Sequence, residues 1–141
     1  RRRQRQMCIR DSFYFPEFHY IDDGSLAALK MAELVSEEGS LSELRGRLPR
    51  RVTLQESLEC PDDAKFEVVR AVRGLMEEVA ESIVDVDGVK GYVGGGWVLI
   101  RASNTQPRVR VTAEVGDRRE AEALLRLGRE FVRSALEEVI G

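Results

Sequence analysis

Cysteine, histidine and long apolar runs are all scarce in this chain of 141 residues. The two cysteines, Cys8 and Cys60, are too few for a disulfide framework and lack the paired spacing of a metal site, which indicates a reducing compartment. No stretch approaches the roughly 18 consecutive apolar residues that a membrane helix needs. We therefore expect a cytoplasmic protein with no membrane partner.

An excess of basic residues is also lacking. Lysine and arginine number 22 against 25 acidic residues, which gives a net charge of −3. A general nucleic-acid-binding protein usually carries a basic excess, so we expect no nucleic-acid partner. The share of hydrophobic residues is 43% and that of charged residues 33%, a balance typical of globular proteins. The length suits one compact domain, alone or with a piece of another.

The first twelve residues differ in composition from the rest. Residues 1–12 hold five arginines and one aspartate, with no apolar periodicity and no apolar stretch of signal-peptide length. We interpret them as a non-native joining segment, with the coding sequence proper starting at Phe13. The alternative is a basic arm that binds nucleic acid, which requires residues 1–10 to be genuine.

Residues 13–49 indicate an extended aromatic segment followed by helices. Pro16 breaks any helix in the aromatic segment, and Asp22-Asp23-Gly24 offers an N-cap for a helix that stops at Gly39. A second short helix is predicted over 40–48, where Pro49 ends it.

From residue 50 onward the pattern predicts an α+β domain, an antiparallel sheet with two helices on one face. The predicted strands are 50–60, 82–86, 89–93, 97–103 and 108–115, with a hairpin turn at Asp87-Gly88. One helix follows Pro61, capped by Asp62 or Asp63, and the other follows a capping box of Asp117 and Glu120. The expected core stripe of the first helix is Phe66, Val69, Val72, Leu75, Met76 and Val79. That of the last helix is Ala121, Leu124, Leu125, Gly128, Phe131, Val132, Ala135, Leu136 and Val139.

The residues best suited to chemistry lie at the end of one predicted strand and in the turn after it. Alternation places Arg101 and Ser103 on the same side of the strand. Ser103, Asn104 and Thr105 add short polar side chains and consecutive backbone N–H groups. Arg110 brings a second guanidinium, and an arginine among hydroxyl donors suits a phosphate monoester. The residue types equally allow a polar hairpin loop with a solvated arginine.

The motif Arg101-x-Ser103-Asn104-Thr105-x-Pro107-x-x-Arg110 resembles the C-terminal signature of the α-D-phosphohexomutase family. That family comprises phosphoglucomutase, phosphomannomutase and phosphoglucosamine mutase. Phe15-Pro16-Glu17, with the helix after residue 24, resembles the end of the family's third domain. The resemblance extends over residues 13–141 and implies that residues 13–49 are a remnant of the third domain. Residues 50–141 would then be the C-terminal phosphate-binding domain.

This resemblance implies a role for each motif residue. Arg101, Ser103, Asn104 and Thr105 would grip the phosphate of a phosphorylated hexose or hexosamine, and Arg110 would support the loop. Gln106 replaces the glutamate commonest in the family at that position. The complete enzymes move a phosphoryl group between the 1- and 6-positions of the sugar through a phosphoserine. By resemblance this chain is the C-terminal portion of such an isomerase, either a phosphoglucosamine mutase or a phosphomannomutase/phosphoglucomutase.

Three family motifs are absent from the sequence. These are the catalytic Thr-x-Ser-His, the Asp-x-Asp-x-Asp-Arg magnesium loop and the Gly-Glu-x-Ser-Gly sugar loop. We therefore expect no catalytic residue and no Mg²⁺ ligand in this chain, and no turnover without the missing N-terminal domains. The alternative function is that of a stand-alone, non-catalytic domain that binds phosphorylated ligands.

Two weaker signals favour structural roles. Asp85-Val86-Asp87-Gly88 lacks the further carboxylates of a calcium loop and predicts a hairpin turn. His19 and Cys60 have no apparent catalytic partner, so we interpret the histidine as packed or partly exposed and the cysteine as a core or edge residue.

Overall fold

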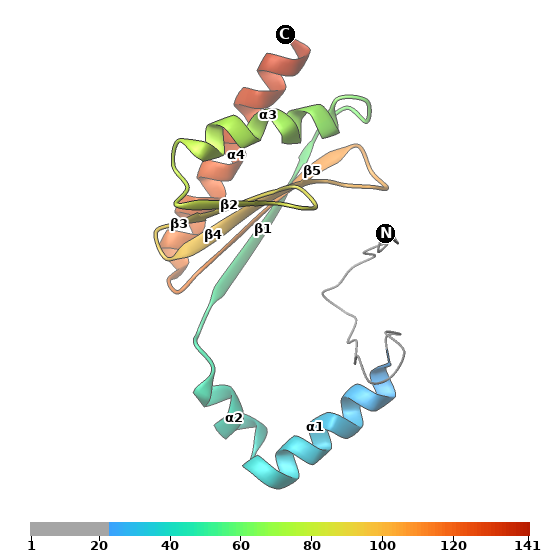
Figure 1. Cartoon of the computed structure of the whole chain (residues 1–141), viewed down its shortest axis with the longest axis vertical. Coiled ribbons are helices and arrows are strands. Elements are labelled where there is room, and N and C mark those ends of the chain that lie inside the picture. The colour runs from blue at the N-terminus through green and yellow to red at the C-terminus, as the bar shows by residue number, and fades with distance from the viewer. Residues whose placement is uncertain (1–22) are drawn as a thin grey trace. The chain divides into compact units, whose positions relative to one another are not determined.

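The computed structural model describes residues 23–141 (Figure 1), and the chain divides into two units at Leu48 and Pro49. The predictions for the joining segment 1–12, the Phe15-Pro16-Glu17 segment, His19 and Asp22 lie outside the described residues.

The first unit contains two capped helices. Helix α1 (Gly24–Glu38) begins at Asp23, whose carboxylate accepts the Leu26 N–H at 2.9 Å, and ends at Gly39. Helix α2 (Leu41–Arg47) begins with a capping box in which Ser40 and Glu43 bond each other's backbone N–H groups. Neither helix has a buried residue, so within the described residues their apolar side chains have no core to pack into.

The second unit is built on a five-stranded antiparallel sheet, as the sequence predicts. Its strands are β1 (Val52–Glu59), β2 (Ser82–Asp85), β3 (Val89–Val93), β4 (Gly96–Ala102) and β5 (Arg108–Val115). They lie in the order β1-β5-β4-β3-β2, which places β1 at an edge beside β5. Each predicted strand agrees with the observed one to within two residues at either end.

Strict alternation gives β5 one buried face. Val109, Val111, Ala113 and Val115 are buried, and the residues between them face the other side. Cross-strand pairing then aligns β5 with β1 on one side and β4 on the other. Strands β3 and β4 are joined by a turn at Gly94 and Gly95, both with positive φ, a conformation that glycine adopts without steric cost.

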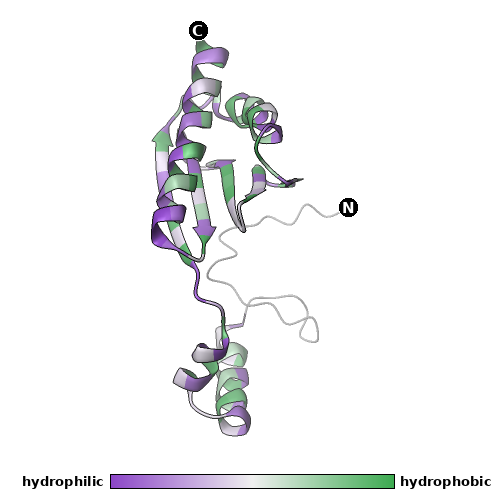
Figure 2. Cartoon of the chain, turned by 90° about the vertical axis from the view of Figure 1, so that its left-hand side faces the viewer, coloured by the Kyte–Doolittle hydropathy of each residue, from purple (hydrophilic) through white to green (hydrophobic). Residues whose placement is uncertain are grey.

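Helices α3 (Lys65–Glu77) and α4 (Arg118–Ile140) pack on the same face of the sheet, next to each other. Helix α4 begins at Asp117, whose carboxylate accepts the N–H groups of Arg119 and Glu120. The predicted stripe of α4 is confirmed. Its buried members are Ala121, Leu124, Gly128, Val132 and Ala135. Figure 2 shows polar and apolar residues alternating along this helix, as expected for one that covers a core on one side.

The prediction for α3 was wrong in two respects. Phe66 is 53% exposed and Val79 is also exposed, whereas Lys65 and Val68 are buried with Val69, Val72 and Met76. The buried face of α3 is therefore rotated about the helix axis relative to the predicted one. The apolar residues of this helix are spread widely enough to allow more than one choice of buried face. Neither Asp62 nor Asp63 caps the helix, since the N-cap position is Ala64, which makes no side-chain cap bond. Asp62 instead forms an ion pair with Lys65.

Across residues 23–141, no helix combines the length and the apolar content that crossing a membrane requires.

Candidate functional site

The two arginines of the motif lie opposite each other on neighbouring strands. In the β4–β5 pairing, the Cα partner of Arg101 is Arg110. Ile100, Val109 and Val111 point into the core beneath the helices, so alternation places both arginines on the opposite, outer face of the sheet. Like charges directly opposite on a sheet repel each other. An anion between the two guanidinium groups would remove that repulsion.

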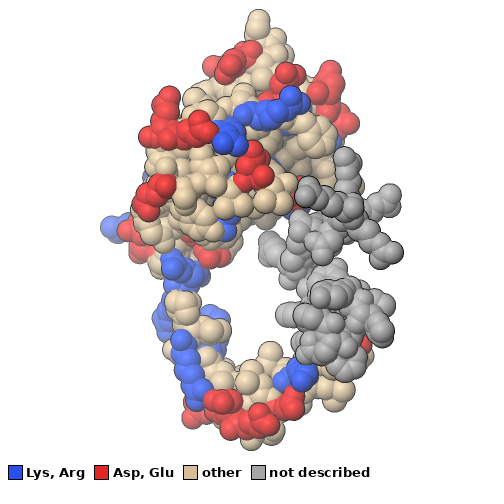
Figure 3. Space-filling model, viewed as in Figure 1, with Lys and Arg blue, Asp and Glu red and all other residues tan. Residues whose placement is uncertain are grey.

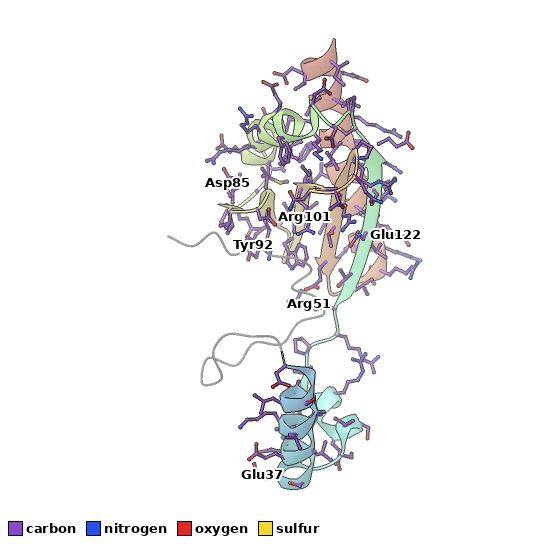
Figure 4. All side chains as sticks on the ribbon, turned by 90° about the vertical axis from the view of Figure 1, so that its right-hand side faces the viewer. Glu37, Arg51, Asp85, Tyr92, Arg101 and Glu122 are labelled. Atoms are coloured by element: carbon purple, nitrogen blue, oxygen red, sulfur yellow. The ribbon has the colours of Figure 1, made fainter. Side chains whose placement is uncertain are left out.

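Asp87 holds the guanidinium of Arg101. The Arg101 Nη1 and Asp87 Oδ2 atoms are 3.4 Å apart, and the Arg101 side chain is 34% exposed. Figure 4 labels Arg101 on its strand. A guanidinium carries five N–H donors, so a contact at one nitrogen leaves others free for a second acceptor. Asp87 lies in the turn between β2 and β3, at the same end of the sheet as Arg101.

Gly88 allows that turn to approach Arg101 closely. Its φ is 111°, a conformation that favours glycine, and a Cβ atom there would lie 2.7 Å from the Cβ of Arg101. The Asp87-Gly88 pair predicted as a turn therefore also places a carboxylate beside the first arginine of the motif.

Ser103 is the buried residue of the motif loop. Strand β4 ends at Ala102, and Ser103 follows it with only 6% exposure, whereas Arg101 is partly open to solvent. The Ser103 N–H donates to the Arg108 carbonyl at 2.9 Å, which closes the loop. This bond continues the pairing of β4 with β5 by one residue beyond Ala102. Asn104 and Thr105 are exposed in the loop.

The loop is also held from the start of α3, a feature that the sequence analysis missed. The Cys60 N–H donates to the Pro107 carbonyl at 3.1 Å. The Lys65 ammonium lies 3.4 Å from the Gln106 carbonyl oxygen. The only sequence signal for Lys65 is its place one turn before Val68 and Val69 on the buried stripe, where a lysine is unexpected.

Positive charge gathers on the outer face at this end of the sheet. Arg108 and Arg110 alternate outward along β5, opposite Glu59 and Ser57 of β1. Within the described part of the chain, the buried Nε atoms of Arg108 and Arg110 have no hydrogen-bond partner. Elsewhere, on the face of the second unit seen in Figure 3, basic and acidic side chains are interspersed.

The thiol beside the loop, that of Cys60, is buried and its pKa is raised. Burial raises the pKa of Cys60, and the negative charge of Asp63 raises it further, although Lys65 opposes both effects. A protonated thiol is a weak nucleophile. Cys60 is buried against the core, as the sequence analysis expected.

Side chains that could ligate a metal are dispersed in the described part of the chain. Among residues 23–141, no three carboxylate, histidine or cysteine side chains gather closely enough to hold a metal ion.

The chain resembles known proteins along most of its length. Residues 57–127 match the family model described as the phosphoglucomutase/phosphomannomutase C-terminal domain. A probable phosphoglucosamine mutase of Methanopyrus kandleri is 40% identical over 125 residues, which are 88% of this chain and 28% of that protein. A protein with the same description from Methanosarcina barkeri is 42% identical over 103 residues, 73% of this chain and 23% of that protein.

A solved structure has the same fold. It is a phosphoglucomutase/phosphomannomutase family protein from Burkholderia thailandensis, with a TM-score of 0.72 and 21% identity, and the match covers 88% of this chain and 26% of that one. The chain thus spans about a quarter of the length of the relatives that it matches.

Proposed function

Because this chain belongs to the phosphoglucomutase/phosphomannomutase family and carries its C-terminal domain, we propose that it binds the phosphate group of a phosphorylated hexose or hexosamine. The observation that carries the proposal is the pairing of Arg101 with Arg110 beside the closed loop 103–107. Two guanidinium groups and a polar loop match the charge and the acceptor oxygens of a phosphate monoester.

Each residue has a distinct part in the proposed site. Arg101 supplies the main charge-assisted hydrogen bonds, while Asp87 fixes the orientation of its guanidinium. Asn104 and Thr105 offer exposed polar groups, and buried Ser103 contributes by closing the loop. Arg110 adds positive charge from the neighbouring strand.

In the complete protein, we infer, this domain holds the phosphate that does not react. The enzyme would be an isomerase that moves a phosphoryl group within a sugar phosphate, and the relatives' names favour phosphoglucosamine mutase. The phosphoserine and the Mg²⁺ ligands would belong to other domains. Binding a remote phosphate tightly helps to orient the sugar for transfer at its other end.

Residues 23–48 fit the proposed role of a remnant of the preceding domain. Helices α1 and α2 expose apolar side chains such as Leu29, Leu34 and Leu41 and bury none. Isolated short helices are marginal in water, and most of their stability comes from packing of an apolar face. We propose that further residues of the same protein supply that packing.

Titration with glucosamine 6-phosphate by calorimetry tests the phosphate site. We expect Arg101→Ala to weaken binding by about tenfold or more, the usual effect of losing a hydrogen bond to a charged group. The fold should persist because Arg101 is partly exposed at a strand end. The matched control is Arg126→Ala, which removes an exposed arginine from α4.

Equal affinities of the Arg101→Ala and unaltered chains would remove the assignment of this site. Equal losses in both variants would show that only the overall charge matters.

A further inference from the structure

Lys65 is a buried cation at the first position of α3. Only 3% of the residue is exposed, although lysine is almost never fully buried unless it is paired. Its aliphatic part lies on the same stripe as Val68, Val69 and Val72, which belong to the core. The ammonium group therefore sits at the edge of the core rather than in solvent.

The partners of this ammonium are an exposed carboxylate and the motif loop. Lys65 Nζ is 2.5 Å from Asp62 Oδ1, and the Asp62 side chain is 73% exposed. The same Nζ atom is 3.4 Å from the carbonyl oxygen of Gln106. It also lies 5.2 Å from the centre of the Phe66 ring. Of these contacts, the hydrogen bond to Gln106 is the one that joins α3 to the loop between β4 and β5.

We propose that Lys65 is a positioning residue for the phosphate-binding loop, an inference that rests on the function proposed above. The Gln106 carbonyl accepts two hydrogen bonds, from the Lys65 ammonium and from the Arg108 N–H at 2.8 Å. With the Cys60 bond to the Pro107 carbonyl, this attaches the second half of the loop to the segment 60–65. The first half is held by the bond from Ser103 to Arg108.

This attachment prepares the loop before the ligand arrives. Asn104 and Thr105 are exposed, and among the described hydrogen bonds neither side chain has one that would hold it. A loop fixed at both ends loses less conformational freedom on binding, so more of the interaction energy appears as affinity. Lys65 thus acts on the phosphate through the backbone of residues 104–106 and not by touching it.

Stability alone does not account for a lysine at this position. Taking an ammonium group out of water is unfavourable, and replacing a buried charge by an apolar residue of similar volume is often neutral or stabilising. Methionine has a similar length and would keep the packing on the core stripe. Lys65→Met should therefore preserve the fold and its unfolding midpoint while it releases the loop.

The test compares three variants of the full chain. Lys65→Met removes the bond to Gln106, Lys65→Arg restores a donor, and Arg70→Met is the control that removes an exposed cation from the same helix. We expect Lys65→Met to weaken binding of glucosamine 6-phosphate by about tenfold, the worth of one hydrogen bond to a charged donor. Lys65→Arg should recover most of the affinity, and Arg70→Met should bind as the unaltered chain does.

A second measurement needs no ligand. Amide hydrogen exchange of residues 103–108, followed by NMR, should become faster in Lys65→Met and stay unchanged in Arg70→Met. Unchanged exchange in Lys65→Met would overturn the positioning role. So would full affinity of that variant for the sugar phosphate.

The two proposals fail in different ways. If the unaltered chain binds neither glucosamine 6-phosphate nor inorganic phosphate, the phosphate-binding function is wrong. Exchange rates would then still decide whether Lys65 holds the loop. A large fall in the unfolding midpoint of Lys65→Met would assign the lysine to stability and overturn its role in positioning.

Discussion

At the candidate site, the neighbours of each arginine determine its electrostatic environment. Arg101 and Arg110 repel each other across the sheet, and Asp87 offsets part of that repulsion from the neighbouring turn. Because the Asp87–Arg101 pair is partly exposed, we expect it to contribute less than about 1 kcal/mol to stability. Its importance lies in the direction that it imposes on the guanidinium.

The buried thiol of Cys60 provides a prediction at this scale. In a chain with Cys8→Ser, where Cys60 is the one remaining cysteine, a thiol reagent should react slowly until the protein unfolds. Burial and Asp63 raise the pKa of Cys60 in the folded state. The unfolded chain therefore ionises first as pH rises, so stability should fall above the ordinary thiol pKa and level off above the raised one.

Urea unfolding at several pH values, with Cys8→Ser/Cys60→Ala as the control, measures that dependence. The double variant should lack the alkaline loss that is due to the thiol. Rapid modification of Cys60 in the native chain would contradict its burial.

At the scale of elements, the closeness of α4 to the sheet depends on one glycine. A Cβ atom at Gly128 would lie 2.5 Å from Val111 Cγ1 and 2.9 Å from Val98 Cγ2. The helix passes over β4 and β5 at that point, so the small residue sets how near the two layers come. Gly74 in α3 has nothing within 4 Å of the equivalent position.

These two helical glycines make a matched pair of substitutions. Gly128→Ala should lower the free energy of unfolding by about 1–3 kcal/mol, because it overpacks the core. Gly74→Ala should raise it by up to about 1 kcal/mol, because alanine favours the helix and meets no neighbour. Urea denaturation monitored by circular dichroism measures both, and shifts of the same sign would contradict the packing of α4 on β4 and β5.

At the scale of the whole molecule, the chain spans about a quarter of the length of its relatives. Its core lies in residues 49–141. There α3 and α4 each pack one side against the sheet. The outer face of the sheet carries the arginines and is not covered by either helix. We propose that this face serves binding, while the groups that phosphoryl transfer requires would lie in other domains of the complete protein.

We therefore expect no mutase turnover from the purified chain. A coupled assay with glucosamine 1-phosphate or glucosamine 6-phosphate, supplied with Mg²⁺, should stay at the background rate because the sequence lacks the family's Thr-x-Ser-His motif and its magnesium loop. A full-length relative is the positive control. Turnover that persists after further purification and scales with the amount of this chain would contradict the proposal.

Local periodicity was enough to predict much of the fold. Alternation over 108–115 identified strand β5 and its buried face, and the apolar spacing of 118–140 identified the buried face of α4. The stripe of α3 was misplaced because Phe66 and Lys65 exchange their expected environments, which depends on the neighbours that the helix meets and not on its own sequence.

At the candidate site, too, the sequence predicted some features and not others. The motif from Arg101 to Arg110 can be recognised from the sequence alone. Its resemblance to a known family predicted the family to which the chain belongs. The part of each motif residue in binding stays a prediction. Only the folded structure showed three further features. Arg101 pairs with Arg110, Ser103 is buried, and the Lys65 ammonium contacts the loop. Spacing along a chain determines which residues share a strand or a helix face, whereas strand register and the packing of α3 against the loop depend on contacts between distant segments.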